Sequence, residues 1–182
     1  LVASRFMADR LLSTRALTID SSGIRKAFDL AAKLADPINL SIGLPDFDVP
    51  EMAKRAAHQA IDAGFNRYTQ TQGIAPLRER LRADLTKEYG LDVGPVLITS
   101  GVNGGLQLAI QSCIDPGDEG IYLNPFFVSY QPMLKLSGGV GVPVDSYPDF
   151  SFHADRVEAA VTPRTKILLL NSPGNPTGVM LS

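Results

Sequence analysis

The sequence contains a single cysteine, two histidines and no tryptophan. One cysteine excludes an internal disulfide framework. Cys113 lies in the apolar stretch LQLAIQSCI, where we expect a buried helical thiol rather than a nucleophile or a metal ligand. Neither sign of charge dominates, since 17 Lys and Arg residues face 19 Asp and Glu residues. No overall field therefore favours nucleic acid or an anionic membrane, and any anion site has to be local.

Long hydrophobic runs are absent as well. No apolar stretch approaches the roughly 20 residues of a membrane span, and residues 1–15 lack the apolar centre of a secretory signal. We therefore expect a cytoplasmic protein without a membrane partner. The 182 residues are 45% hydrophobic, which is enough for a substantial core.

In the first part of the chain, proline and glycine positions bound stretches of helical periodicity. The predicted elements are a helix over 24–35, an extended piece over 38–43, and helices over 51–63 and 77–89. The last helix is the most regular, because Leu77, Leu81 and Leu85 recur every four positions before Gly90.

From Val96 onward, short apolar strands alternate with helices. The predicted strands cover 96–100, 119–123, 139–144 and 166–171, and the predicted helices cover 103–114 and 127–137, the second interrupted at Pro132. Residues 167–170 are apolar on both sides of the pleat, as expected for a strand with helices on both faces. This alternation indicates an α/β layer fold.

The junction ITSGVNGG over 98–105 is the first with chemical content. A strand that turns through Gly101 into a helix directs unpaired backbone N–H groups and the positive end of the helix dipole at one spot. The glycine spacing is neither that of the triphosphate loop nor Gly-x-Gly-x-x-Gly. A phosphate cradle and an ordinary glycine turn both remain open here.

Two further junctions follow predicted strands. Phe126 and Phe127 come after the strand over 119–123, where an aromatic ring can lie against a planar heterocycle or simply fill the core. The string NSPGNPTG over 171–178 follows the last strand, and its prolines and glycines would hold the asparagine amides in place at the strand's carboxyl end. An ordered asparagine amide can donate to a phenolate oxygen, although a purely structural turn is the alternative.

The string NSPGNPTG closely resembles the signature of fold-type I pyridoxal-phosphate-dependent aminotransferases of class I/II, the aspartate-aminotransferase-like group. The segments NLSIGLPDFDVP, FNRYTQTQGIAPLRERL, SGVNGGLQLAI and DPGDEGIYLNPFFVSY resemble other motifs of this family in matching order, so the resemblance spans nearly the whole chain. It implies a three-layer α/β fold, in which a mixed, mostly parallel sheet is sandwiched by helices. Residues 1–45 would form an amino-terminal arm of the small domain, and 46–182 the first part of the cofactor-binding large domain.

The resemblance also implies the cofactor, pyridoxal 5'-phosphate, and the residues that bind it. Gly101, Val102 and Asn103 would hold the phosphate, the first two through backbone amides. Phe127 would stack on the pyridine ring, and Asn175 would donate to the phenolic oxygen.

Other positions are implied for substrate, partner and backbone. Tyr68 matches the family's tyrosine that reaches the phosphate of the neighbouring subunit, which requires a homodimer; a surface or packing tyrosine is the alternative. Gly43 would lie beside the substrate carboxylate. Pro176 is expected to follow a cis peptide bond.

No catalytic residue and no metal ligand is assigned within the chain. The family's Schiff-base lysine, the aspartate of the pyridine nitrogen and the arginine of the substrate carboxylate all follow the NPTG turn, so we expect them beyond Ser182. The chain opens on Leu1 without a methionine and stops after a turn. We therefore expect a truncated chain that is inactive by itself.

The implied function is transfer of an amino group between an amino acid and a 2-oxo acid, with the chain supplying the cofactor-anchoring half. A lyase or synthase of the same fold, such as an aminocyclopropane-carboxylate-synthase-like protein, remains an alternative. Others are the aminotransferase-like sensor domain of a transcription regulator and a remnant that binds nothing. Which amino acid is the substrate stays open.

Overall fold

The computed structural model describes residues 11–19, 30–31, 33–34, 36, 38, 43 and 45–181. The chain forms two compact units: the sheet unit (residues 1–22 and 101–182) and the helical unit (residues 23–100). The predicted helix over 24–35 and extended piece over 38–43 fall mostly outside the described residues. The predicted domain boundary after residue 45 stays a prediction.

The sheet unit is built around three parallel strands. Its elements are α2 (Thr14–Leu17), α6 (Gly101–Cys113), β1 (Glu119–Asn124), α7 (Tyr130–Leu136), β2 (Val140–Asp145), α8 (Ala154–Ala160) and β3 (Thr165–Leu169). The strand order is β2-β1-β3, and Ile121 of β1 lies opposite Val142 on one side and Leu168 on the other. The structure thus confirms the predicted α/β fold with a parallel sheet.

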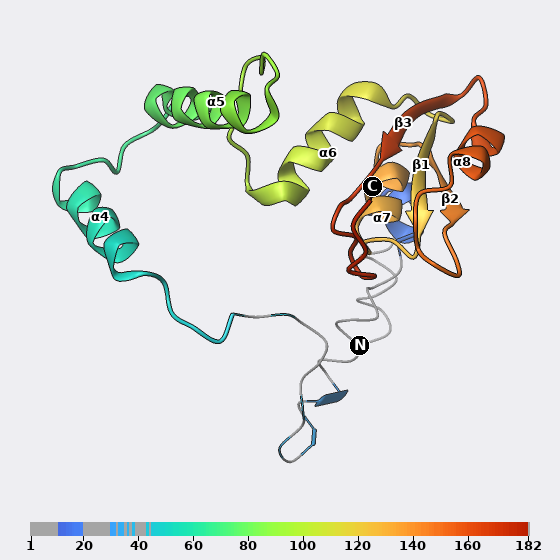
Figure 1. Cartoon of the computed structure of the whole chain (residues 1–182), viewed down its shortest axis with the longest axis horizontal. Helices are drawn as coiled ribbons and strands as arrows, with labels where there is room; N and C mark the ends of the chain where they lie inside the picture. Colours follow the sequence, from blue (N-terminus) through green and yellow to red (C-terminus); the bar gives the residue numbers. More distant parts are fainter. Residues whose placement is uncertain are drawn as a thin grey trace. The chain divides into compact units, whose positions relative to one another are not determined.

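Helices cover both faces of this sheet (Figure 1). Successive side chains of β1 point to opposite faces, so β1 contributes to a separate core on each face. Tyr122 faces a core formed with α6 and α7, whose buried members are Ile110, Ile114, Tyr130, Met133 and Leu134. Ile121 faces a second core with Val144 of β2 and Val157 of α8. β1 is therefore the middle of three layers and is buried on both faces.

Two glycines make room for large side chains in the first core. A Cβ on Gly141 would lie 2.7 Å from the hydroxyl of Tyr122, and a Cβ on Gly120 would lie 2.6 Å from Cδ2 of Leu134. Tyr122 is fully buried, and its hydroxyl has no hydrogen-bond partner among the described residues. Burial raises the pKa of this hydroxyl, which stays neutral.

Two sequence predictions are wrong in detail. α7 runs through Pro132 without interruption, because Pro132 is in the first turn, where a backbone N–H has no helical acceptor to lose. The described residues show no strand over 96–100. A strand needs a ladder partner, and the amide of Ile98 instead donates to the carbonyl of Gln72 at 3.0 Å.

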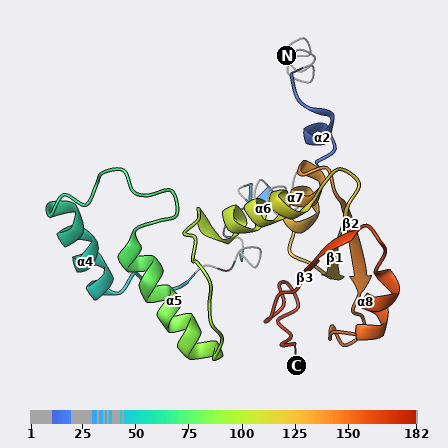
Figure 2. The ribbon, with the colours of Figure 1, turned by 90° about the horizontal axis from the view of Figure 1, so that it is seen from above.

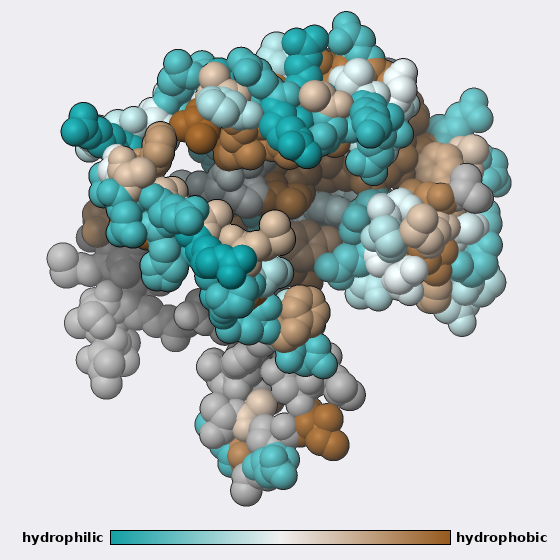
Figure 3. Space-filling model, turned by 60° about the vertical axis from the view of Figure 1, so that its left-hand side comes forward, coloured by the Kyte–Doolittle hydropathy of each residue, from teal (hydrophilic) through white to brown (hydrophobic). Residues whose placement is uncertain are grey.

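Burial was overestimated at two places. Cys113 is exposed, since the buried face of α6 and its extension carries Ile110 and Ile114. Ile167 and Leu169 of β3 contact the first core, but Leu168 and Leu170 are exposed because α8 packs on β2. Hydrophobic side chains therefore reach the surface, as the brown atoms of Figure 3 show.

The helical unit confirms both predicted helices, α4 (Glu51–Asp62) and α5 (Ala75–Tyr89), drawn in Figure 2. Gly90 ends α5 in the left-handed conformation, with φ of 65°, and its N–H donates to the carbonyl of Thr86. Within the described ranges, no helix combines the length and the apolar character needed to cross a membrane.

Glu119, at the start of β1, is a buried carboxylate with several donors. It accepts hydrogen bonds from the hydroxyl of Thr162 at 2.5 Å and from Nε and Nη2 of Arg164 at 3.0 and 2.6 Å. These bonds, that of Thr162 foremost, hold the pKa of Glu119 below its ordinary value. The network ties the start of β1 to the turn before β3.

We predict that Glu119 makes stability depend on pH. Because its pKa is lowered in the folded protein, its contribution is fully present above the ordinary value of 4.5 and is lost as the pH falls below it. Thermal unfolding should show Glu119→Gln less stable than the parent at pH 7, with the gap narrowing toward pH 3. A gap that stays constant over this range would contradict the assignment.

We also predict that Tyr122→Phe raises the free energy of unfolding by about 1 kcal/mol, because it removes a buried hydroxyl without a partner. Gly141→Ala should lower it by about 1–3 kcal/mol through overpacking, and by less when combined with Tyr122→Phe. Denaturant titration of the four proteins measures both effects. Equal costs of Gly141→Ala in the two backgrounds would contradict the contact.

Candidate functional site

The carboxyl ends of the three strands meet at one edge of the sheet, where Asn124 is the last residue of β1, and Ser146 and Asn171 closely follow β2 and β3. Ser146 is 2% exposed and ties two of these ends together. Its backbone N–H and its hydroxyl both donate to the carbonyl of Asn124, at 3.0 and 2.8 Å. This edge is where open α/β sheets bind ligands.

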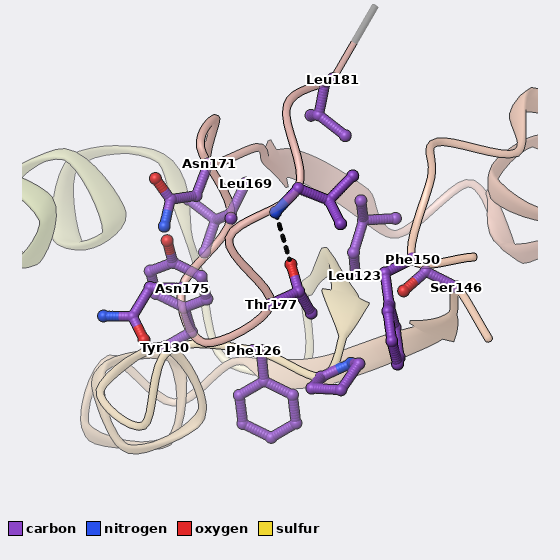
Figure 4. Close-up of a pocket in the computed structure, with 13 residues that line it drawn as sticks. Leu123, Phe126, Tyr130, Ser146, Phe150, Leu169, Asn171, Asn175, Thr177 and Leu181 are labelled. Carbon is purple, nitrogen blue, oxygen red and sulfur yellow. Dashed lines mark hydrogen bonds between the residues drawn. The ribbon is translucent and has the colours of Figure 1, made fainter. Parts of the chain in front are cut away.

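The loop over 171–178 is held by hydrogen bonds of its own. The N–H of Gly178 donates to the carbonyl of Gly174 at 2.7 Å, and the N–H of Gly174 donates to the carbonyl of Val179 at 2.8 Å. The dashed line in Figure 4 marks a further bond, from the N–H of Val179 to Oγ1 of Thr177. The Asn175-Pro176 peptide bond is cis, which confirms that prediction.

Beneath the loop lies a small pocket, lined by Leu123, Phe126, Phe150, Thr177 and other residues. Its volume of about 30 Å³ is far below the several hundred Å³ of a typical cofactor site. In Figure 4 the amides of Asn171 and Asn175 lie on the other side of the loop from Ser146 and Phe150. Both asparagines nevertheless contribute to the lining of this pocket, as do Ser146 and Phe150.

Both asparagines are available to a ligand. Asn171 and Asn175 are exposed, and neither side-chain amide makes a hydrogen bond within the described part of the chain. Each amide offers two N–H donors and one carbonyl acceptor. The loop thus presents ordered but unsatisfied polar groups at the sheet edge.

The ring of Phe127 packs against a cluster of buried tyrosine rings. Its ring meets that of Tyr130 edge-to-face, with centroids 5.7 Å apart and planes at 72°. Tyr130 is buried and in turn contacts Tyr122 at 6.1 Å, and burial raises the pKa of the Tyr130 hydroxyl. Phe127 is half-buried, so it contributes to the core and still reaches the surface.

The start of α6 carries the predicted phosphate-binding residues. Gly101 adopts the left-handed conformation, with φ of 69°, at the first position of the helix. Val102 is 78% exposed, and Asn103 is also exposed, with no side-chain hydrogen bond in the described ranges. α6 begins toward the side of the sheet unit at which β3 ends (Figures 1 and 2).

Tyr68 and Gly43 belong to the helical unit. Tyr68 is fully exposed, and no atom outside its chain neighbours lies within 4 Å of a Cβ built on Gly43. The sheet unit contains Gly101, Val102, Asn103, Phe127 and Asn175. The binding roles of these five residues, and those of Tyr68 and Gly43, stay predictions.

Sequence reasoning did not find Ser146 or Tyr130. Ser146 carries a signal only in retrospect, as a serine directly after a strand that pairs with β1. Tyr130 lies three residues after Phe127 and begins α7, which places both rings on one side of the junction. Sequence reasoning also missed the helix α8, whose first turn contains Asp155.

The fold is that of an α/β protein in which asparagine residues lie at the carboxyl ends of parallel strands. The family model for aminotransferase class I and II matches residues 35–182, and the chain belongs to this family. It is 43% identical over 159 residues to the aspartate/prephenate aminotransferase of Thermus thermophilus, covering 85% of the chain and 41% of that protein. It is 39% identical over 176 residues to aromatic-amino-acid aminotransferase 2 of Thermococcus litoralis, covering 94% and 45%.

Solved structures agree. The structure of the aspartate aminotransferase from Thermus thermophilus with maleate matches with a TM-score of 0.88 at 40% identity, over 94% of the chain and 47% of that protein. The aspartate aminotransferase from Rhizobium meliloti matches with a TM-score of 0.88 at 35% identity, over 94% and 45%. The chain spans less than half the length of these relatives.

We predict that Gly101→Ala destabilises the protein by about 1 kcal/mol, because an L side chain is strained at this positive φ. No atom would clash with the new Cβ, so the cost is that of the backbone alone. Gly101→Asn should cost less, since asparagine tolerates this conformation. Gly94→Ala is the matched control, with open space around its Cβ and no positive φ. Chemical denaturation measures all three, and equal effects of Gly101→Ala and Gly94→Ala would contradict the prediction.

Proposed function

We propose that the protein is a pyridoxal-phosphate-dependent aminotransferase that moves an amino group between an amino acid and a 2-oxo acid. In this proposal the chain supplies the cofactor-anchoring half. The main supporting observation is the loop over 171–178, which is held by its own backbone hydrogen bonds. The side-chain amide of Asn175 in this loop makes no hydrogen bond within the described residues, and it follows a strand at the same sheet edge as Phe127.

The residues at this edge fit the cofactor by their chemistry. Pyridoxal phosphate, when bound, supplies an electron-withdrawing ring and a carbonyl carbon that can accept and release an amino group. In the first turn of α6, the backbone amides of Gly101 and Val102, together with Asn103, would hold the phosphate, because a helix N-terminus suits an anion. Phe127 offers a ring for stacking, and Asn175 offers N–H donors for a phenolic oxygen.

Each contact has a distinct effect. The helix dipole of α6 and the side chain of Asn103 fix the anionic end of the cofactor and thereby its position along the sheet edge. Phe127 excludes water from one face of the ring. A hydrogen bond from Asn175 stabilises negative charge on the phenolic oxygen and lowers the pKa of groups conjugated with it.

Two residues of the helical unit complete the proposal. Tyr68 is fully exposed, in keeping with a hydroxyl that binds the phosphate in a partner subunit, and Gly43 would leave room for the substrate carboxylate. The protein would then act as a homodimer. The residue that binds the cofactor covalently is proposed to be a lysine beyond Ser182, so that residues 1–182 alone are inactive.

The relatives favour transamination over lyase or synthase chemistry, because those described above are named aminotransferases. Their names include aspartate, prephenate and aromatic amino acids. An amino acid with its 2-oxo acid is therefore the proposed substrate class.

Reductive trapping tests the proposal. The full-length protein is incubated with pyridoxal phosphate, reduced with borohydride, and analysed by intact mass and peptide mapping. We expect one stable adduct on a lysine beyond Ser182, and amino transfer to a 2-oxo acid by the unreduced protein. Asn175→Ala should weaken cofactor binding about tenfold or more, the size of one hydrogen bond to a charged group.

Asn66→Ala is the control for Asn175→Ala, because Asn66 is also exposed and has no contact with the cofactor in this proposal. A polypeptide of residues 1–182 should give no specific adduct. A full-length protein that takes up no cofactor would overturn the proposed function.

A further inference from the structure

A tight turn over 70–73 in the helical unit is fixed to the segment that follows α5. The N–H of Gly73 donates to the carbonyl of Gln70 at 2.9 Å, and the N–H of Ile98 donates to the carbonyl of Gln72 at 3.0 Å. Gly73 has φ of 94°, and a Cβ built on it would lie 2.7 Å from Cβ of Ile98. Both the backbone conformation and the close approach therefore require glycine.

Arg78, from the first turns of α5, holds the same turn from another side. Its Nε donates to the carbonyl of Gly73 at 3.0 Å, and its Nη2 donates to Oε1 of Gln70 at 3.2 Å. The planar guanidinium group thus binds both Gln70 and Gly73, the first and last residues of the turn. A lysine ammonium could not make this pair of bonds in the same geometry. The side chain is half-buried, so the bond to the carbonyl of Gly73 is partly shielded from water, whereas the bond to Gln70 is exposed.

Arg78 differs from the neighbouring arginines on α5 in the groups that its side chain binds. Arg80 and Arg82 form ion pairs with Asp84 and Asp92. Arg78 bonds to neutral oxygens of the turn, and no carboxylate of the described residues lies within ion-pair distance of it. Its function in the helical unit is therefore to hold the turn rather than to balance an acid.

Tyr68 lies two residues before this turn. Its side chain is fully exposed, and its ring makes no aromatic contact within the described part of the chain. Packing of its own ring therefore cannot fix it. The nearest fixed point along the chain is Gln70, which is held by Arg78.

We infer that Arg78 is a positioning residue for Tyr68: by holding the turn over 70–73, it sets where the Tyr68 hydroxyl meets a cofactor phosphate. This inference rests on the proposed function, and it adds a residue that does not itself touch the cofactor. Loss of Arg78 then affects recognition of the phosphate but not of the ring.

Comparison of two ligands tests the inference. Dissociation constants of pyridoxal phosphate and of pyridoxal, which lacks the phosphate, are measured by titration of the full-length protein. Arg78→Met should weaken binding of pyridoxal phosphate about five- to tenfold and leave binding of pyridoxal unchanged. Arg82→Met is the matched control, because Arg82 lies on the same helix and bonds to Val93 and Asp92 instead. It should change neither constant.

A double-mutant cycle with Tyr68→Phe shows whether the effect passes through Tyr68. We expect the double variant to bind pyridoxal phosphate no more weakly than the weaker single variant. Additive losses, or equal losses for pyridoxal, would overturn the inference. If Tyr68→Phe is silent, the phosphate role of Tyr68 fails and the inference with it. If Tyr68→Phe weakens binding and Arg78→Met does not, only the inference fails.

Gln70→Leu keeps the test decisive if Arg78→Met does not fold. It removes only the bond from Nη2 of Arg78, at an exposed side chain. The same selective loss for pyridoxal phosphate, smaller in size, is expected, and an unchanged constant in a protein with the parent's melting temperature would overturn the inference.

Discussion

Parallel pairing of β1 with both of its neighbours is the constraint on which the sheet unit depends. A parallel strand needs a crossover on its way to the next, and the two crossovers place α7 on one face, where α6 also packs, and α8 on the other. The same pairing brings all strand carboxyl ends to one edge. Ser146 then joins two of these ends through the carbonyl of Asn124, which makes the edge a firm base for the loops above it.

Helices with clear stops were predictable from local sequence, because Gly64 and Gly90 adopt the left-handed conformation that ends a helix. The strands predicted over 119–123 and 139–144 form as β1 and β2, because each provides the ladder partner that the other needs. The prediction over 96–100 was wrong, since apolar character says nothing about whether a ladder partner is present. Exposure of Leu168 and Cys113 depends in the same way on which elements cover them.

The candidate site divides along similar lines. The string over 171–178 and the glycine at 101 were recognisable because their backbone demands are written in proline and glycine. Ser146 and Tyr130 were missed because a serine or a tyrosine gains its role only from tertiary contacts. The ring of Tyr130 packs against that of Phe127, and Arg78 bonds to the turn that follows Tyr68, so two of the proposed ligand-binding residues have supporting partners that tertiary structure alone reveals.

The internal hydrogen bonds of the loop over 171–178 have a kinetic consequence. Conformational entropy of this segment is lost when the chain folds, not when a ligand arrives. A ligand that binds at this proposed site would therefore need no slow rearrangement of the loop before it associates. The residence time of such a ligand would then depend on how many of the exposed asparagine N–H donors it binds.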